Sequence, residues 1–220
     1  EANETIQLTL SAGSGYVAGS PGAATTTINN DDTLTITPIV AVTGVNHSTT
    51  ADGFSFVALQ DITAGTVVYF TENPFTNSTL TFSGAEAVMQ WTAPVGGLAR
   101  GQVVVATETG ANTFTTTCSS GTCGSVGVVS GSFTLATTGE ELYAYLDSDN
   151  NPTNGVTSVQ AVLFTGTSVV SGGTIPTAQD PVLVYPGAVL VDGFPAVAPL
   201  RTEYNPALRG TTVDRANFQN

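Results

Sequence analysis

The 220-residue chain is 41% hydrophobic and contains 24 Gly and 11 Pro, a composition that favours short strands joined by turns. Its 17 acidic residues stand against four arginines and no lysine, which gives a formal net charge of −13. This charge argues against nucleic acid or an anionic membrane as a partner, and the absence of lysine excludes Schiff-base chemistry and Lys–Asn isopeptide cross-links. No apolar run of about 18 residues occurs, so membrane insertion is not expected.

The first predicted element is a β-hairpin in residues 4–28. Alternation with a period of two, typical of half-buried strands, occurs on both sides of a connection rich in Gly and Ser. The residues predicted to share one face, and to act as assembly strands, are Ile6, Leu8, Leu10, Ala24, Thr26 and Ile28. Because an isolated two-stranded hairpin is marginally stable in water, we expect these strands to join a further sheet.

A second predicted domain, residues 33–220, follows the hairpin domain of residues 1–32. Short strands separated by Gly, Asn and Pro turns predict a sandwich or barrel, and we favour an all-β antiparallel sandwich with an N-terminal hairpin appendage. Strands are predicted at 33–42, 52–60, 61–71, 87–94, 101–108, 131–135, 140–147, 158–166 and 186–194. The strand at 101–108 is predicted to be buried on both faces. The strands at 131–135 and 140–147 are predicted to form a hairpin, and residues 211–219 are predicted to form a short helix.

Two family resemblances extend this prediction. The run NETIQLTL, the Gly-rich bend and the ending INNDD resemble the last two strands of a Calx-beta domain. Residues 34–220 resemble bacterial extracellular lamin-tail-like β domains, in the stretches 52–75, 80–107 and 131–146. These resemblances imply an immunoglobulin-like or lamin-tail-like sandwich, an extracellular or cell-surface location and a non-enzymatic structural or adhesive role.

Cys118 and Cys123 are the two cysteines of the chain, and four small residues separate them. That spacing permits a disulfide, which an exported location favours. Zinc needs two more soft ligands, and His47 is the single histidine available.

Calcium is the one cofactor that the sequence suggests. Asp31 and Asp32 match the closing acidic residues that help to bind Ca²⁺ in Calx-beta domains. We favour an inter-module turn at this position, because two aspartates alone cannot provide the six to eight oxygens that calcium needs. Asp147, Asp149 and Asn151 place oxygen ligands at alternate positions, as calcium loops do. Pro152 replaces the central glycine of such a loop and no Glu occupies position twelve, so a polar hairpin turn is the favoured interpretation of this second stretch.

No catalytic constellation is evident, and we expect the protein not to be an enzyme. The chain lacks a G-x-S-x-G motif, and we interpret Glu72, Glu140 and Glu141 as surface carboxylates rather than a glycosidase pair. Asn77 is the most loop-like of three N-glycosylation sequons. The aromatic residues that could form a sugar-binding platform, but that we assign to the core, are Tyr69, Phe70, Trp91, Tyr143 and Tyr145.

These features predict an extracellular structural protein. The favoured function is a subunit of a bacterial surface fibre, filament or surface layer, in which copies join by β-strand addition through the N-terminal strands. The alternative is a calcium-dependent adhesion or carbohydrate-binding module of a large secreted repeat protein, with a glycan as partner. A secreted hydrolase that uses carboxylate pairs is the third class.

Overall fold

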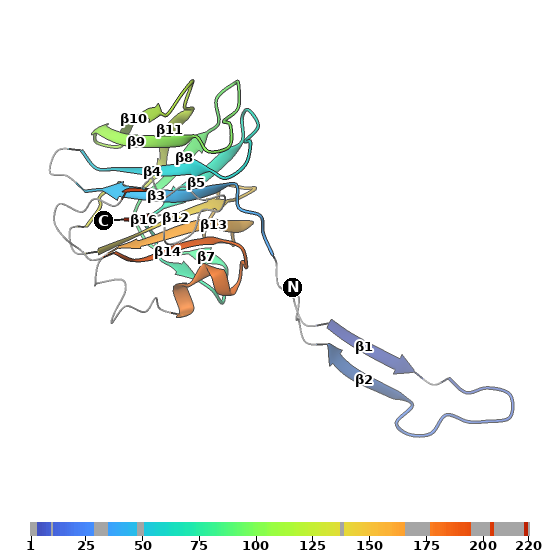
Figure 1. The fold of residues 1–220 in the computed structure, drawn as a ribbon. Helices are drawn as coiled ribbons and strands as arrows, with labels where there is room; N and C mark the ends of the chain where they lie inside the picture. The colour runs from blue at the N-terminus through green and yellow to red at the C-terminus, as the bar shows by residue number, and fades with distance from the viewer. Residues whose placement is uncertain are drawn as a thin grey trace. The chain divides into compact units, whose positions relative to one another are not determined.

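A computed structural model describes residues 4–9, 11–28, 35–47, 51–136, 139–165, 177–194, 203–204 and 218–219. Internal contacts divide the chain into two units, Glu1–Leu34 and Thr35–Asn220, which are described separately here. Figure 1 labels most of their strands, which are numbered in chain order.

The first unit contains an antiparallel hairpin of strands β1 (Glu4–Thr9) and β2 (Ala23–Ile28). Ile6 lies opposite Thr26 and Leu8 opposite Ala24, so the alternating residues of the two strands share a face as their sequence predicts. The hairpin is a two-stranded sheet, and the described residues contain no third strand paired with it.

The second unit is a β-sandwich, as predicted. Its four-stranded sheet has the order β10 (Thr113–Cys118), β9 (Val103–Gly110), β4 (Gly53–Ala58) and β3 (Val40–Asn46). Its six-stranded sheet has the order β11 (Ser125–Ser130), β8 (Val88–Thr92), β5 (Val67–Thr71), β12 (Gly139–Leu146), β13 (Ser158–Thr165) and β14 (Val189–Phe194). Neighbouring strands are antiparallel except β13 and β14, which are parallel.

The main core fills the space between the two sheets. Phe70 of β5 is at its centre, with ring centroids 4.8 Å from Phe54 and 5.0 Å from Phe56, both on β4 of the opposite sheet. Trp91 of β8 meets Phe56 edge-on at 5.1 Å. All four side chains are buried, so these ring contacts join the sheets across the sandwich.

A third layer covers the outer face of the six-stranded sheet. It consists of the short hairpin β6 (Phe75–Thr76) and β7 (Thr81–Phe82) and a segment with two 3-10 turns, η1 (Thr177–Gln179) and η2 (Pro181–Leu183). The larger buried rings of this outer cluster are Tyr69, Phe75, Phe82, Tyr143, Tyr145, Phe164 and Tyr185. Strands β12 and β13 are therefore buried on both faces, and the aromatic residues assigned to the core are indeed buried.

Three local predictions are wrong. Residues 131–135 form no strand, because backbone N–H groups of this segment donate to side chains instead of to a partner strand. Strand β9 is buried on one face only, since Val105 is 39% exposed between buried neighbours. Phe218–Gln219, at the end of the predicted helix, forms strand β16, which pairs with β15 (Glu203–Tyr204); 205–217 lie outside the described residues.

Candidate functional site

The N-terminal hairpin exposes both of its faces. Ile6 is 46% exposed and Leu8 is 72% exposed on the apolar face. On the opposite face, Gln7 donates a side-chain hydrogen bond to Thr25 across the strands at 3.2 Å. Within its own unit, the hairpin is therefore an amphipathic ribbon with a Thr-rich polar face and an exposed apolar face. Among the predicted residues of this region, Leu10, Asp31 and Asp32, together with the side chain of Ile28, lie outside the described structure.

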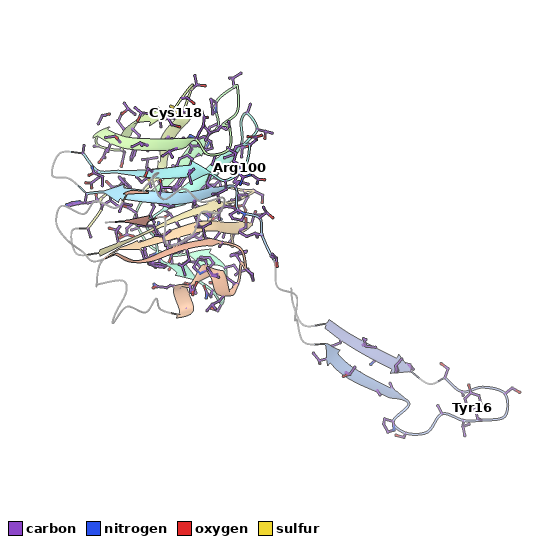
Figure 2. The ribbon with its side chains drawn as sticks, in the orientation of Figure 1. Tyr16, Arg100 and Cys118 are labelled. Carbon is purple, nitrogen blue, oxygen red and sulfur yellow. A yellow bond between two sulfur atoms is a disulfide. The ribbon has the colours of Figure 1, made fainter. Side chains whose placement is uncertain are left out.

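The connection between the two strands is also exposed. Gly13 and Tyr16 close a tight turn through two backbone hydrogen bonds of 3.3 Å, and Tyr16, labelled in Figure 2, is 55% exposed. An open hollow of about 340 Å³ lies where the connection returns to the strands, lined by Leu8, Thr9, Pro21, Gly22, Ala23 and Ala24. The tip of the hairpin thus presents apolar surface as well.

The predicted disulfide is present between Cys118, labelled in Figure 2, and Cys123, with their Cα atoms 5.5 Å apart. It closes the turn between β10 and β11, the edge strands of the two sheets. The Trp91 indole N–H donates to the Cys123 carbonyl oxygen at 2.8 Å, which ties the turn to the core. Gly124 follows with φ +72°, and a Cβ there would clash with the Thr92 carbonyl oxygen, so this position requires glycine.

Replacing both cysteines with serine is expected to lower the free energy of unfolding by about 2 kcal/mol, because the cross-link restricts a short loop of the unfolded chain. Urea unfolding monitored by tryptophan fluorescence measures this difference. A reducing agent should destabilise the wild-type protein by a similar amount and leave the double variant unchanged. Equal stability of the oxidised and reduced wild-type protein would contradict the prediction.

The predicted calcium-loop residues lie together in the turn between β12 and β13. The Asn151 backbone N–H donates to Asp147 at 2.8 Å and to Asp149 at 3.0 Å. The Asn154 side chain donates to the other Asp149 oxygen at 2.8 Å, and this hydrogen bond lowers the pKa of Asp149. The side-chain oxygens of the three residues thus organise a polar turn. Calcium binding at this turn stays a prediction.

Asn77, the predicted glycan acceptor, follows β6 and is half-buried. Its side-chain nitrogen, the atom to which a glycan would be attached, donates to the Asp180 carbonyl oxygen at 2.9 Å. Its backbone N–H donates to the Ala178 carbonyl oxygen at 2.9 Å. Asn77 therefore connects the β6–β7 hairpin to the 3-10 segment of the outer layer, and its glycosylation stays a prediction.

One end of the sandwich contains a group of acidic residues, named here the acidic end cluster: Asp52, Glu72, Glu86, Glu140 and Glu141. Glu72 directly follows β5, Glu86 precedes β8, and Glu140 and Glu141 lie at the start of β12, on three adjacent strands. Asp52 immediately precedes β4 of the opposite sheet.

The interpretation of these glutamates as surface carboxylates is wrong. Glu72 is 1% exposed, and Glu140 and Glu141 are each 7% exposed. By strand alternation, Glu72 and Glu140 face the space between the sheets with Phe70 and Leu142, whereas Glu141 shares the outer face with Tyr143. The outer layer buries the second face of the six-stranded sheet, and the sequence pattern did not predict this layer.

A short segment of chain covers this cluster. Residues 133–136 are named here the strap. The side chains of its residues Phe133 and Leu135 are buried in the main core. The Leu135 backbone N–H donates to Asp52 at 3.0 Å, and the Ala136 N–H donates to Glu140 at 2.6 Å. Two consecutive backbone donors therefore bind carboxylates from opposite sheets.

Glu72 is the least solvated member of the cluster. Neither of its carboxyl oxygens has a hydrogen-bond partner of good geometry among the described residues. Burial, followed by the nearby Glu140 and Glu86, raises the pKa of Glu72 to about 8, although the backbone N–H groups of Thr134 and Ala87 oppose this rise. A carboxyl group in this environment retains its proton at neutral pH.

The pKa values of the neighbouring glutamates are raised as well. Burial raises the pKa of Glu140 to about 7, while hydrogen bonds from the backbone N–H groups of Ala136 and Glu141 limit the shift. Burial and then the charge of Glu140 raise the pKa of Glu141 to about 8, and burial also raises the pKa of Glu86. Three buried carboxyl groups thus titrate near neutrality at one end of the fold.

His47 follows β3 at the same end of the sandwich. Its Nδ1 atom lies 3.3 Å from Asp52 Oδ1, a distance that allows an ion pair when the imidazole is protonated. Nothing in the sequence pattern indicated that His47 lies beside Asp52.

Among the described residues, no group of three or more His, Cys, Asp or Glu side chains is arranged to hold a metal ion. In the same part of the chain, no helix has the length and apolar character needed to cross a membrane.

No protein-family model matches the chain, and no curated protein or solved structure is significantly similar to it. The resemblances to Calx-beta and lamin-tail-like domains therefore stay predictions from the sequence motifs.

Proposed function

We propose that the protein is a non-enzymatic structural protein of the bacterial cell surface, whose copies assemble when the N-terminal hairpin adds to a sheet of another copy. The observation that supports this proposal most directly is the apolar face of the hairpin, which is exposed within its own unit, with Leu8 72% exposed. A two-stranded sheet has open backbone edges and gains stability when it pairs with further strands.

The charge distribution favours a second copy of the chain as the partner. Residues 5–30 contain no charged side chain, although the whole chain carries a net charge of −13. Residues 109–139, which include the edge strands β10 and β11, also contain none. Two such copies repel each other over most of their surface, and these uncharged segments are where they can approach.

The edge strands β10 and β11 also have the geometry of an acceptor. Each ends its sheet among the described strands, and along each the side chains alternate between exposed and partly buried. A hairpin that adds to an edge of the next copy makes a head-to-tail contact, which does not close and therefore produces filaments.

Deletion of residues 1–32 is expected to convert assemblies of the protein into monomers, because it removes the adding strands. Analytical ultracentrifugation gives the mass, and negative-stain electron microscopy shows whether filaments remain. Assemblies of unchanged size after the deletion, or a full-length protein that is monomeric at every concentration, would overturn the proposal.

Two point variants of the full-length chain provide a matched comparison. Leu8→Glu places a charge on the apolar face and is expected to prevent assembly, since this charge would have to be buried. Gln7→Glu adds the same charge to the Thr-rich face of the same strand and should leave assembly intact. Equal effects of the two variants would exclude docking through the apolar face.

A further inference from the structure

We infer that strand β10 of the four-stranded sheet is the edge that receives the hairpin of another copy, and that β2 is the hairpin strand that pairs with it. This inference rests on the proposed assembly function and deepens it, because it names the acceptor strand, the adding strand and the faces that meet. The contact joins the four-stranded sheet of one copy to the hairpin of the next.

The pattern of strand pairing favours β10 among the edge strands. Of the strands that end the two main sheets in the described part of the chain, β3 has no exposed residue and β14 carries the charged residue Asp192. Strand β11 pairs with β8 through a bulge between Val128 and Ser130, whereas the pairing of β10 with β9 is regular from Phe114 to Cys118. A bulge twists an edge and hinders further pairing, so β10 is the better acceptor.

The backbone of β10 directs hydrogen-bonding groups to this edge, which lies at the margin of the second unit in Figure 1. The Ser119 N–H, directly after the strand, donates to the carbonyl oxygen of Val103 on β9 at 3.2 Å. In a regular antiparallel ladder, residues alternate between facing the partner strand and facing away from it. The residues of β10 whose backbone groups face away from β9 are therefore Phe114, Thr116 and Cys118.

The two faces of β10 differ in the same way as the two faces of the hairpin. Thr113, Thr115 and Thr117 are exposed on the outer face of β10. Phe114 and Cys118 lie on the inner face and pack against the main core. An added strand must therefore present a polar face on the outside and an apolar face on the core side.

The hairpin meets this requirement. Thr25 and Thr27 share one face of β2, and Gln7 of β1 lies opposite Thr25 on that face. Ala24 lies opposite Leu8 on the apolar face. When β2 pairs with β10, its threonines extend the exposed threonine row, and its apolar face lies on the core side of the extended sheet. Cross-strand threonine pairs and burial of apolar surface both stabilise such a contact.

Charge selects β2 as the adding strand. Strand β1 begins with Glu4, whereas residues 23–28 carry no charged side chain. Strand β10 is also uncharged, although the whole chain carries a net charge of −13. Pairing of β2 with β10 therefore brings two acidic copies together without placing carboxylates next to each other.

Site-specific photo-crosslinking of the full-length protein tests the choice of strands. The photoreactive residue p-benzoylphenylalanine replaces Thr115 on the outer face of β10 or, as the control, Ser125 on the outer face of β11. Filaments grown from mixed ¹⁵N-labelled and unlabelled copies are irradiated, and mass spectrometry identifies the joined peptides. We expect the Thr115 probe to join the peptide that contains residues 23–28 of a different copy, and the Ser125 probe to give little of this product.

The outcomes separate this inference from the proposed function. Filaments in which the hairpin cross-links to the Ser125 probe and not to the Thr115 probe would overturn the choice of β10 alone. Cross-links confined to a single chain would overturn it as well. A full-length protein that forms no assembly at any concentration would overturn the proposed function and this inference together.

Two variants at one position test the open edge of β10. Thr116→Pro removes an N–H that faces this edge and leaves the donors to β9 in place, so the concentration needed for assembly should rise by about tenfold or more. Thr116→Val is the matched control. It also loses the side-chain hydroxyl, which donates to the Gly124 carbonyl oxygen at 2.7 Å, but it keeps the backbone N–H and should assemble as the wild type does. Circular dichroism verifies that both variants are folded, and equal assembly of the two would contradict pairing at β10.

Discussion

Replacing Phe70 with alanine is expected to lower the free energy of unfolding by about 3–5 kcal/mol. The Phe70 ring is fully buried between the sheets and contacts Phe54 and Phe56 of the opposite sheet. Both partners are fixed on β4, so they have little freedom to fill the cavity that the substitution leaves. Urea unfolding, monitored by circular dichroism, measures the change.

Two further variants make this prediction specific. Phe70→Leu removes less volume and should have a smaller effect, which provides a measurable variant if Phe70→Ala does not fold. Val105→Ala is the control for a side chain on the partly exposed face of β9, and it should change stability by less than about 1 kcal/mol. A loss below about 1 kcal/mol for Phe70→Ala would show that the sheets do not depend on this ring contact.

Replacing Glu72 with glutamine is expected to raise the free energy of unfolding at pH 8 by about 2–4 kcal/mol and to change it little at pH 5. The wild-type carboxyl has a pKa of about 8 in the folded protein and an ordinary value of 4.5 in the unfolded chain. Between these values the unfolded chain binds fewer protons, so the stability of the wild type falls as pH rises. Glutamine carries no charge at any pH, so the variant does not lose this stability as the pH rises.

Urea unfolding at several pH values between about 5 and 9 measures the slope directly. The wild type should lose stability across this range, and Glu72→Gln should have a flatter profile. Asp61→Asn, which alters an exposed carboxylate, should retain the wild-type slope. If Glu72→Gln shifts stability equally at every pH, the residue acts through packing or hydrogen bonding and its ionisation is irrelevant.

Local features of both units could be predicted from the sequence, because they follow patterns that short-range physics explains. The alternation around Ile6 and Ala24 predicted one shared face, and the structure places the described residues of the two strands in that register. The spacing of Cys118 and Cys123 permitted the disulfide, which is present. In each case the relevant partners lie within a few residues or in adjacent strands.

The acidic end cluster could not be predicted, since its burial depends on contacts between distant segments. Glu140 and Glu141 are consecutive, and alternation predicts that at least one faces solvent unless both faces of the sheet are covered. The outer layer covers the second face, and its 3-10 segment follows β12 by some thirty residues. The sequence predicted a strand at residues 131–135 because Phe133 and Leu135 alternate with polar residues as in a strand. In the structure, the backbone N–H groups of the strap donate to carboxylates instead of to a partner strand.

The parallel pairing of β13 with β14 links the outer layer to the edge of the six-stranded sheet. Parallel neighbours require a crossover, so the chain after β13 must travel back along the sheet before β14 can begin. Residues 177–188 belong to this return path, and they carry Tyr185 and Ala188 into the outer ring cluster. A proteolytic cut in this path would therefore loosen a strand and uncover the tyrosine face in a single event.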